Sequence, residues 1–460
     1  MAAKRIVLLT GNPLRSNPRV IKEGAALVEA GYEVIVLGAW SGGRMAEGGG
    51  AKPEIRDRRS ENGWRMEEGG GVERLEQRPE DRDQRPEIGG VEIDMRLAGQ
   101  GGYTFVPLLP PDTIQGKLHR LVQRLARKCA PRSRWSFGLM PFALKRAAAR
   151  LKPDLAIAHS EPALFAALAL HKQGTKVGLD MEDWFSEDLL PEARSRRPVE
   201  LLRKAERELL VCSVHATCTT EVMADALASA YACPRPTRIY NVFPALDLSA
   251  DEPLKDRSAA SRSLNGTASR GRNAVSIHWF SQTIGPGRGL ERLFEACSGL
   301  DADFEIHLRG NLGPYGAWIE RVVPTGLRPR VFLHATVAND ELPAKIAEHD
   351  IGYAGEVADI PSRNLTATNK IFQYLQGGLA VVASDTDGQK EVAKFSGEAV
   401  TLYASTSTEE LRHCLARVIS NPGQLAAAKS AAARIASESL SWSMEKPRLL
   451  ASVRHALGEE

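Results

Sequence analysis

The sequence is poor in the residues that cross-link a small protein or bind a structural metal. Its six cysteines, at positions 129, 212, 218, 233, 297 and 414, are scattered through 460 residues, with no Cys-x-x-Cys pair and no grouping with histidine at zinc spacing. This pattern argues against a disulfide framework and against a structural metal site, and it favours reduced thiols in the cytosol.

Long apolar runs and an excess of charge are also lacking. No segment approaches the roughly 20 consecutive apolar residues that a membrane-spanning helix requires. The first predicted strand begins at residue 5, which leaves no room for a signal peptide ahead of it. A formal net charge of +3 gives no general reason to expect binding of nucleic acid. We therefore expect a cytoplasmic protein.

The sequence does contain an alternation of short apolar strands and helical patterns over most of its length. This alternation is typical of open, parallel α/β sheets covered by helices on both faces. A chain of 460 residues exceeds the size at which one core keeps growing, so two such domains are expected. The predicted strands are residues 5–10, 33–38, 91–97, 154–159, 176–181 and 214–218, then 274–280, 304–308, 331–334, 351–354, 379–383 and 399–402.

Composition divides the chain into domains. Residues 41–90 carry two glycine triplets among mixed Arg, Glu and Asp, which predicts an exposed, loosely ordered insertion. Residues 246–273 lose apolar periodicity, which predicts a linker. We therefore expect a first domain over residues 1–245, a second over 274–440 and a terminal helix over 441–460. A helix over residues 18–30, opened by Asn17 and Pro18, should follow the first strand.

The most informative segment lies at residues 366–391, where a polar helix start, a glycine stop and a buried strand follow without a gap. Thr368 or Asn369 can cap this helix, and a glycine pair ends it. A helix N-terminus leaves backbone N–H groups and a positive dipole end free for a phosphate, and Lys370 adds a full charge. The pattern also fits a surface helix with a solvated lysine.

This segment resembles the donor-binding motif of retaining, nucleotide-sugar-dependent GT-B glycosyltransferases (group 1, family 4-like), through Asn369-Lys370-Ile-Phe-Gln373-Tyr and the later Gly-Leu-Ala-Val-Val-Ala-Ser-Asp. The resemblance implies two Rossmann-like domains with parallel sheets facing across a cleft, the first for the acceptor and the second for the donor. It implies sugar transfer from a nucleotide-diphosphate sugar to a glycan or lipid-linked acceptor, as in polysaccharide biosynthesis, without an essential metal or another cofactor. It also implies that the helix over residues 441–460 crosses back to the first domain.

In the first domain the resemblance points to two strand ends. The turn after the first strand lacks the full Gly-x-Gly-x-x-Gly of dinucleotide sites, so a nicotinamide or flavin is not expected. By resemblance, Gly11, beside Asn12, would leave space for the donor sugar, and Arg19 would face the cleft; a solvated arginine is the alternative. His159 follows a buried strand and matches the family's histidine that contacts the sugar, although a structural histidine fits the pattern too.

Three carboxylates, those of Asp180, Glu182 and Asp183, gather at the end of another predicted strand. Their mutual repulsion can raise one pKa and create a proton acceptor. We interpret them as contacts to the acceptor that line the cleft, with a helix N-cap network as the alternative.

The second domain offers cations for the donor diphosphate. Arg288, followed by glycine, resembles the family's basic-Gly pair, but Gln282 stands where another basic residue is usual. Arg309 follows a predicted strand and can supply the missing charge, although a surface arginine fits the pattern equally well.

The acidic pair that the family uses for sugar and ribose is altered here. Leu365 and Gln373 occupy its two positions. Gln373 can still bond ribose hydroxyls, and Glu356 resembles a carboxylate that some members place upstream of the helix. These departures keep two alternatives to transfer open, namely a non-catalytic nucleotide-binding scaffold and a nucleotide-sugar epimerase of the same fold.

Residues 114–134 combine leucines at helical spacing with many lysines and arginines. Such a basic amphipathic helix can lie on an anionic membrane surface, which would place the protein at the inner membrane face and suit a lipid-linked acceptor. In the alternative interpretation, the helix packs its leucines on the first sheet and leaves a solvated basic face.

Overall fold

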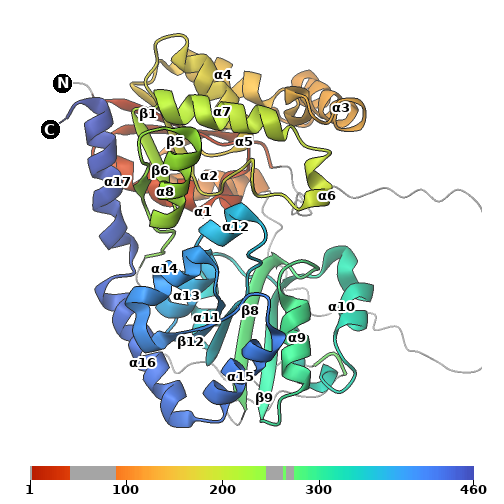
Figure 1. The fold of residues 1–460 in the computed structure, drawn as a ribbon. Coiled ribbons are helices and arrows are strands. Elements are labelled where there is room, and N and C mark those ends of the chain that lie inside the picture. Colours follow the sequence, from red (N-terminus) through yellow and green to blue (C-terminus); the bar gives the residue numbers. More distant parts are fainter. Residues whose placement is uncertain (1–2, 42–89, 245–262, 266–273, 460) are drawn as a thin grey trace, which may run out of the picture.

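The computed structural model describes residues 3–41, 90–244, 263–265 and 274–459, and shows two α/β domains stacked one above the other (Figure 1). The insertion predicted at residues 41–90 and the linker predicted at 246–273 lie almost wholly outside these residues. No helix within the described ranges is long and apolar enough to span a bilayer.

The described part of the first domain holds a seven-stranded parallel sheet in the order β3-β2-β1-β4-β5-β6-β7. Its strands are β1 (Arg5–Leu9), β2 (Glu33–Ala39), β3 (Thr104–Leu108), β4 (Leu155–Ala158), β5 (Val177–Met181), β6 (His215–Cys218) and β7 (Thr237–Arg238). Its helices are α1 (Pro18–Glu29), α2 (Gly90–Gln100), α3 (Ile114–Cys129), α4 (Met140–Leu151), α5 (Glu161–His171), α6 (Pro191–Arg194), α7 (Val199–Cys212) and α8 (Glu221–Tyr231).

The described part of the second domain repeats this architecture with a six-stranded parallel sheet in the order β10-β9-β8-β11-β12-β13. Its strands are β8 (Val275–Thr283), β9 (Phe304–Asn311), β10 (Val331–His334), β11 (Ile351–Ala354), β12 (Ala380–Ser384) and β13 (Val400–Tyr403). Its helices are α9 (Leu290–Ser298), α10 (Gly316–Val322), α11 (Leu342–Ala347), α12 (Pro361–Leu365), α13 (Asn369–Gln376), α14 (Asp387–Ser396), α15 (Thr408–Ile419) and α16 (Pro422–Glu438), and α17 (Trp442–Leu457) follows.

Both sheets are buried on both faces, which explains why their strands read as continuous apolar runs. In the first domain α4, α5, α7 and α8 pack on one face of the sheet, and α1, α2 and α17 pack on the other. In the second domain α9, α10 and α15 cover one face, and α11, α13 and α14 cover the other. The predicted fold class, two Rossmann-like domains with parallel sheets, is confirmed.

One predicted strand is wrong. Residues 91–97 belong to the helix α2, and the strand that pairs with β2 is β3, which the sequence analysis missed together with the two-residue β7. Alternating apolar residues gave this segment the period of a strand. The buried positions of α2 are Gly90, Asp94 and Ala98, which recur every four residues on one helix face. Asp94 accepts hydrogen bonds from Arg15 N at 2.8 Å and Ser41 Oγ at 2.6 Å.

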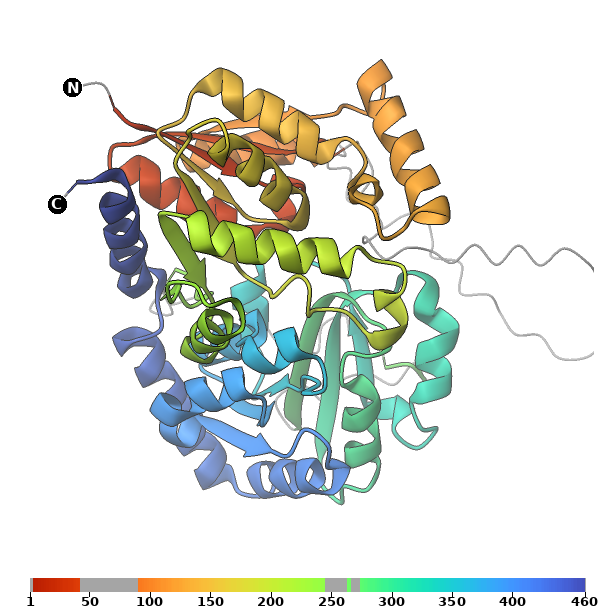
Figure 2. The same ribbon diagram turned by 45° about the horizontal axis from the view of Figure 1, so that its top comes forward.

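Helix α17 ties the end of the chain to the first domain (Figure 2). Leu449 and Val453 pack in a core cluster with α1 and β1. Lys4 Nζ donates to the Leu457 carbonyl at 3.0 Å, and Lys176 Nζ donates to the Ala456 carbonyl at 2.9 Å. The last helix therefore belongs physically to the first domain although it follows the second in sequence.

Strand order creates a switch point in each sheet, where chain progression reverses direction. The switch lies between β1 and β4 in the first sheet and between β8 and β11 in the second. Ligands of open α/β sheets bind beyond the carboxyl ends of strands at such points. Predicted site residues lie near both of these places.

Candidate functional site

A cavity of about 320 Å³ lies between the two domains. Its floor comes from the second domain, near the carboxyl ends of β8 and β9 and the start of α13, and one wall comes from the segment between β1 and α1. The lining residues are Arg15, Ser16, Pro18, Phe243, Phe280, Ser281, Gln282, Arg309, Thr336, Val337, Asn339, Leu342, Thr368, Asn369, Lys370 and Gln373. The structure thus brings Arg309, Thr368, Asn369, Lys370 and Gln373 of the predicted site together.

Lys370 is the cation at the start of α13. Its Nζ lies 2.7 Å from Glu356 Oε1, and both side chains are largely shielded from solvent. Glu356 follows β11, and its backbone N–H donates to Ser384 Oγ at 2.8 Å. The ion pair therefore ties the strand end to the helix start and orients the lysine beside the cavity.

Three buried polar atoms of the lining residues find no hydrogen-bond partner among the described residues: Arg309 Nε, Thr368 Oγ1 and Gln373 Oε1. Thr368 occupies the N-cap position of α13, but its hydroxyl makes no capping bond, unlike the cap that the sequence suggested. Buried polar groups are nearly always hydrogen-bonded, because leaving one unsatisfied costs about 1–3 kcal/mol. All three belong to residues that line one cavity, where small side-chain rotations would let a polar ligand satisfy them.

The charge of Arg309 is a second reason to expect a polar ligand in the cavity. Its Nη1 donates to the Ala335 carbonyl at 3.0 Å, and no carboxylate in the described ranges pairs with it. Burial lowers the pKa of Arg309, which remains far above neutrality and keeps the side chain charged. A buried guanidinium without a directly paired carboxylate is costly. Glu348 offsets part of this cost at longer range, and an anionic ligand would offset more.

Arg288 lies at the edge of this region and not among the lining residues. Its Nη1 donates at 3.0 Å to Ser281 Oγ, which does line the cavity. The side chain is exposed, and this bond uses only one of the five N–H donors of its guanidinium. Gln282, in the position where the family carries a cation, lines the cavity and is also exposed.

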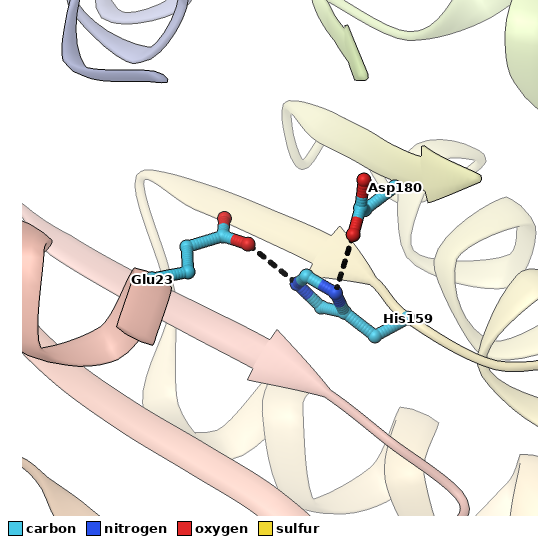
Figure 3. Close-up of side chains that lie close together, drawn as sticks. All are labelled: Glu23, His159 and Asp180. Carbon is cyan, nitrogen blue, oxygen red and sulfur yellow. Dashed lines mark ion pairs between the residues drawn. The ribbon is translucent and has the colours of Figure 1, made fainter. Parts of the chain in front are cut away.

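The first-domain switch point holds a different arrangement, a buried charged network (Figure 3). His159 follows β4, with its Nε2 3.3 Å from Glu23 Oε2 of α1 and its Nδ1 3.3 Å from Asp180 Oδ2 of β5. Arg19 of α1 holds both oxygens of Asp180, with Nε to Oδ2 at 2.5 Å and Nη2 to Oδ1 at 2.8 Å. Thr217 Oγ1 also donates to Asp180 Oδ1 at 2.6 Å.

The pKa values of this network follow from burial opposed by charge pairing. Burial alone would lower the pKa of His159, but the Glu23 and Asp180 carboxylates outweigh it and raise that pKa above its ordinary value of 6.5. Burial raises the pKa of Glu23 to about 7. For Asp180, burial is outweighed by Arg19 and His159, which hold its pKa well below the usual range. His159 therefore lies between two carboxylates that both favour its protonated form.

Glu23, His159 and Asp180 place one ligand atom each within 4.8 Å of one another, a spacing that a metal ion can bridge. The Arg19 guanidinium occupies both oxygens of Asp180 and already supplies the positive charge. A divalent cation here would lie against this guanidinium, which Coulomb repulsion in a buried site disfavours. The trio therefore fits a charge-compensated network better than a metal centre.

Two of the first-domain predictions are explained by local packing. A Cβ on Gly11 would lie 2.2 Å from Pro162 Cγ, and the Gly11 N–H donates to Ser160 Oγ at 2.7 Å, so the start of α5 fills the space beside this glycine. The Asn12 N–H donates to Thr10 Oγ1 at 3.2 Å within the same turn. None of Gly11, Asn12, Arg19 and His159 lines the cavity, and their contact with a sugar stays a prediction.

The three carboxylates near the end of β5 have different surroundings. Asp180 belongs to the buried network, and Glu182 Oε1 accepts a hydrogen bond from Asn241 Nδ2 at 2.8 Å. Burial and the neighbouring Asp188 raise the pKa of Asp183 well above its usual range. Burial is also the largest cause that raises the pKa of Glu182, so two of the three carboxyl groups have raised pKa values, and repulsion from neighbouring acids adds to the effect of burial at both.

Leu365 contacts the first domain. It packs against that domain's hydrophobic core, and its carbonyl accepts a hydrogen bond from Thr220 Oγ1 at 2.6 Å. Nearby, the Trp184 N–H donates to Ser362 Oγ at 2.9 Å. The short helix α12 thus links the two domains, which gives the leucine at this motif position a packing reason.

Several lining residues were missed from the sequence. Arg15 and Ser16 form a short 3-10 turn, Leu14–Ser16, immediately before α1. Phe280 and Ser281 occupy the end of β8, and Thr336 follows β10. All lie near carboxyl ends of parallel strands, so the strand-end rule would have found the positions, but not which side chains face the other domain.

A scan against protein-family models finds no match for this chain, and a search of curated proteins finds none either. Solved structures do match. HepE from Anabaena in complex with UDP-glucose superposes with a TM-score of 0.64 at 15% identity, covering 98% of this chain and 99% of that one. Sucrose-phosphate synthase from Thermosynechococcus elongatus gives 0.63 at 12% identity, covering 99% and 100%.

A putative UDP-N-acetylglucosamine 2-epimerase from Listeria monocytogenes gives a TM-score of 0.52 at 11% identity, covering 100% of this chain and 98% of that one. At such identities the likeness shows the fold. The chain has the GT-B architecture, with two parallel-sheet Rossmann-like domains.

Proposed function

We propose that the protein is a glycosyltransferase that moves a sugar from a nucleotide-diphosphate sugar to a glycan or lipid-linked acceptor, with retention of configuration. The observation that carries this proposal is the interdomain cavity, where Lys370 and Arg309 accompany buried polar atoms without protein partners. The likeness to HepE, solved with UDP-glucose, supports a nucleotide sugar as the ligand.

In this proposal the cations hold the diphosphate. Lys370, the free N–H groups at the start of α13 and Arg309 surround one end of the cavity, and Arg288 joins from the edge. The departing diphosphate gains negative charge in the transition state, so fixed positive groups stabilise that state more than the bound substrate. These protein cations perform the charge stabilisation that would otherwise call for a metal ion.

Gln373 and Thr368 hold the nucleoside in this scheme. Gln373 Oε1 can accept a hydrogen bond from a ribose hydroxyl, and Thr368 Oγ1 can bond either a hydroxyl or a phosphate oxygen. In this scheme the amide of Gln373 replaces the family's carboxylate. It keeps a hydrogen-bond acceptor for the ribose and adds no negative charge near the diphosphate.

The first experiment is a thermal-shift screen of UDP, GDP, ADP, CDP and dTDP, followed by calorimetric titration of the best ligand. We expect one nucleoside diphosphate to raise the melting temperature and the others to have little effect. Its sugar conjugates are then tested for transfer, and NMR of the product anomer decides retention. If no nucleoside diphosphate binds, the cavity has another ligand and the proposal fails.

A second candidate, epimerisation, is favoured by the likeness to the Listeria epimerase. Incubation of the bound sugar nucleotide without acceptor distinguishes it, because an epimerase produces a second sugar nucleotide and a transferase does not. Binding without turnover of any kind would instead indicate the non-catalytic scaffold that Leu365, Gln373 and Gln282 suggest.

A further inference from the structure

Helix α3 carries an apolar face that the rest of the described molecule does not cover. Leu118 is 47% exposed and Ile114 is 85% exposed, and the other two members of the face lie between these values. The four residues recur at intervals of four, three and four, which places them on one side of a helix. They are Ile114, Leu118, Leu121 and Leu125.

The opposite side of α3 is the one that packs on the protein. Gly116 and Ala126 are buried, and His119 Nδ1 accepts a hydrogen bond from the Leu139 N–H at 2.9 Å. A Cβ on Gly116 would lie 1.9 Å from the Pro110 carbonyl oxygen, so this face is in close contact. The interpretation in which α3 packs its leucines on the sheet is therefore wrong, and α3 stands at the outer edge of the first domain (Figure 2).

Positive charge flanks the apolar face. Residues 114–134 contain seven lysines and arginines and no aspartate or glutamate, whereas the whole chain has a formal net charge of only +3. No carboxylate within the described residues forms an ion pair with a cation of α3. The five exposed cations that lie within α3 itself are Lys117, Arg120, Arg124, Arg127 and Lys128.

An exposed aromatic pair lies in the segment that follows. Trp135 and Phe142 stack with ring centroids 5.3 Å apart and are 41% and 43% exposed, and Arg134 lies over both rings. Phe142 also borders a groove of about 530 Å³, whose lining includes apolar residues, three lysines and Glu208. Tryptophan is enriched at the boundary between water and lipid.

We propose that the leucine face of α3, together with the Trp135–Phe142 pair, docks on an anionic lipid bilayer. An apolar stripe with a cationic flank matches acyl chains beneath a negatively charged surface, whereas a protein partner for this face would need acidic groups around its own apolar patch. A second copy of this chain would bring the same unpaired cations together at the interface. This inference stands apart from the proposed enzyme activity, because docking needs no donor.

The test is co-sedimentation of the full chain with vesicles of phosphatidylcholine alone or containing about one-third phosphatidylglycerol. We expect binding to the anionic vesicles, little binding to the neutral ones, and a decrease with added salt. The variant Leu118→Ser/Leu121→Ser/Leu125→Ser should lose at least about tenfold in partition coefficient, because each change removes apolar surface from the bilayer.

Charge is tested separately. The variant Lys117→Gln/Arg124→Gln should bind about 25-fold more weakly, at about fivefold per cation removed. Its matched control, Arg321→Gln/Lys394→Gln, removes two exposed cations from the second domain and should bind like the wild type. All changed side chains are exposed, so melting temperatures should stay near that of the wild type, and each variant is checked in this way.

Brominated acyl chains provide a local reporter. They should quench emission from the wild type, and Trp135→Phe should remove much of that quenching while the six other tryptophans remain. Failure of the wild type to sediment with anionic vesicles would overturn the proposal. So would binding that the triple variant retains, or a dimer in light scattering that the triple variant abolishes without any vesicle binding.

Discussion

The two switch points of this protein hold similar kinds of charged and polar side chain, which differ in how they are bonded. In the first domain, Arg19, His159 and Asp180 are buried and bonded to one another. In the second, Arg309 and Gln373 are buried beside a cavity with polar atoms left over. Charged residues at a strand end therefore do not by themselves mark a ligand site. Within the described residues, His159 Nε2 and Glu23 Oε1 also lack a hydrogen-bond partner, so the second region is distinguished by the cavity beside it and by a cation without an ion pair.

The difference has a physical cause in the neighbouring helices. Helix α1 runs close enough to the first switch point for Arg19 and Glu23 to reach across to β4 and β5, so acid and base neutralise one another. At the second switch point the ends of β8 and β9 face the other domain across a cavity. Charges that pair with one another within the protein stabilise the fold. Charges left without such a pair beside a cavity can instead bind a ligand of opposite charge.

The largest expected effect comes from removing a charge from the buried network at the first switch point. Asp180→Asn removes the charge that both Arg19 and His159 share, and an uncompensated buried cation costs about 3–5 kcal/mol of unfolding free energy. Urea unfolding measures this loss. The control is Asp225→Asn, which breaks the exposed pair with Arg235 and should cost about 0.2–1 kcal/mol. Equal losses in the two variants would contradict the buried network.

Breaking the second region should act on binding instead. Lys370→Ala should weaken the nucleoside diphosphate by about 1.5–3 kcal/mol, the range for a hydrogen bond to a charged group. Calorimetric titration measures the affinity. Loss of the shielded ion pair with Glu356 should also lower the melting temperature of the free protein, so the titration is carried out well below that temperature. Lys390→Ala, which removes an exposed lysine beside Asp387, is the control and should bind normally. Unchanged affinity in Lys370→Ala would remove this lysine from the site.

His159→Gln sharpens the comparison through pH. The pKa of His159 is raised in the fold, so its stabilising contribution is complete below about pH 6.5 and is lost as pH rises through the folded value. The difference in unfolding free energy between wild type and variant should therefore shrink from pH 6 towards pH 8. A difference that is constant over this window would show that the fold does not raise the pKa of His159.

The same variant separates the structural role of His159 from contact with sugar. A purely structural histidine should lower stability and affect all ligands together. A histidine that touches sugar should reduce transfer while the affinity for the sugar-free diphosphate stays unchanged. Melting temperature, diphosphate affinity and turnover, measured on one preparation, decide between the two.

The smallest expected effect concerns Gln373. If its amide bonds a ribose hydroxyl, the wild type should prefer the ribonucleotide to the deoxyribonucleotide by about 0.5–1.5 kcal/mol, the net contribution of one neutral hydrogen bond. Gln373→Ala should lose this preference. Equal discrimination in both proteins, measured by titration with each nucleotide, would place the ribose elsewhere in the cavity.

By itself, the sequence determined the fold class and named much of the candidate site in the second domain. Apolar runs bounded by glycine and proline define parallel strands, and the segment at residues 366–391 places Thr368, Lys370 and Gln373 on one helix start because helical spacing is a local property. It misplaced one strand at residues 91–97, where local alternation mimicked a sheet and the burial of Asp94, held by Arg15 and Ser41, selected a helix.

Only the tertiary structure decided which polar side chains neutralise one another. Arg19 and Asp180 are 161 positions apart, and no local pattern shows that they meet, whereas Arg309 reaches the cavity without a carboxylate from the described chain. The structure likewise decided that α3 turns its leucines outward, because a helix pattern shows that an apolar face exists but not what covers it. Such pairings depend on the distance between segments that are remote in sequence, and that distance exists only once the chain is folded.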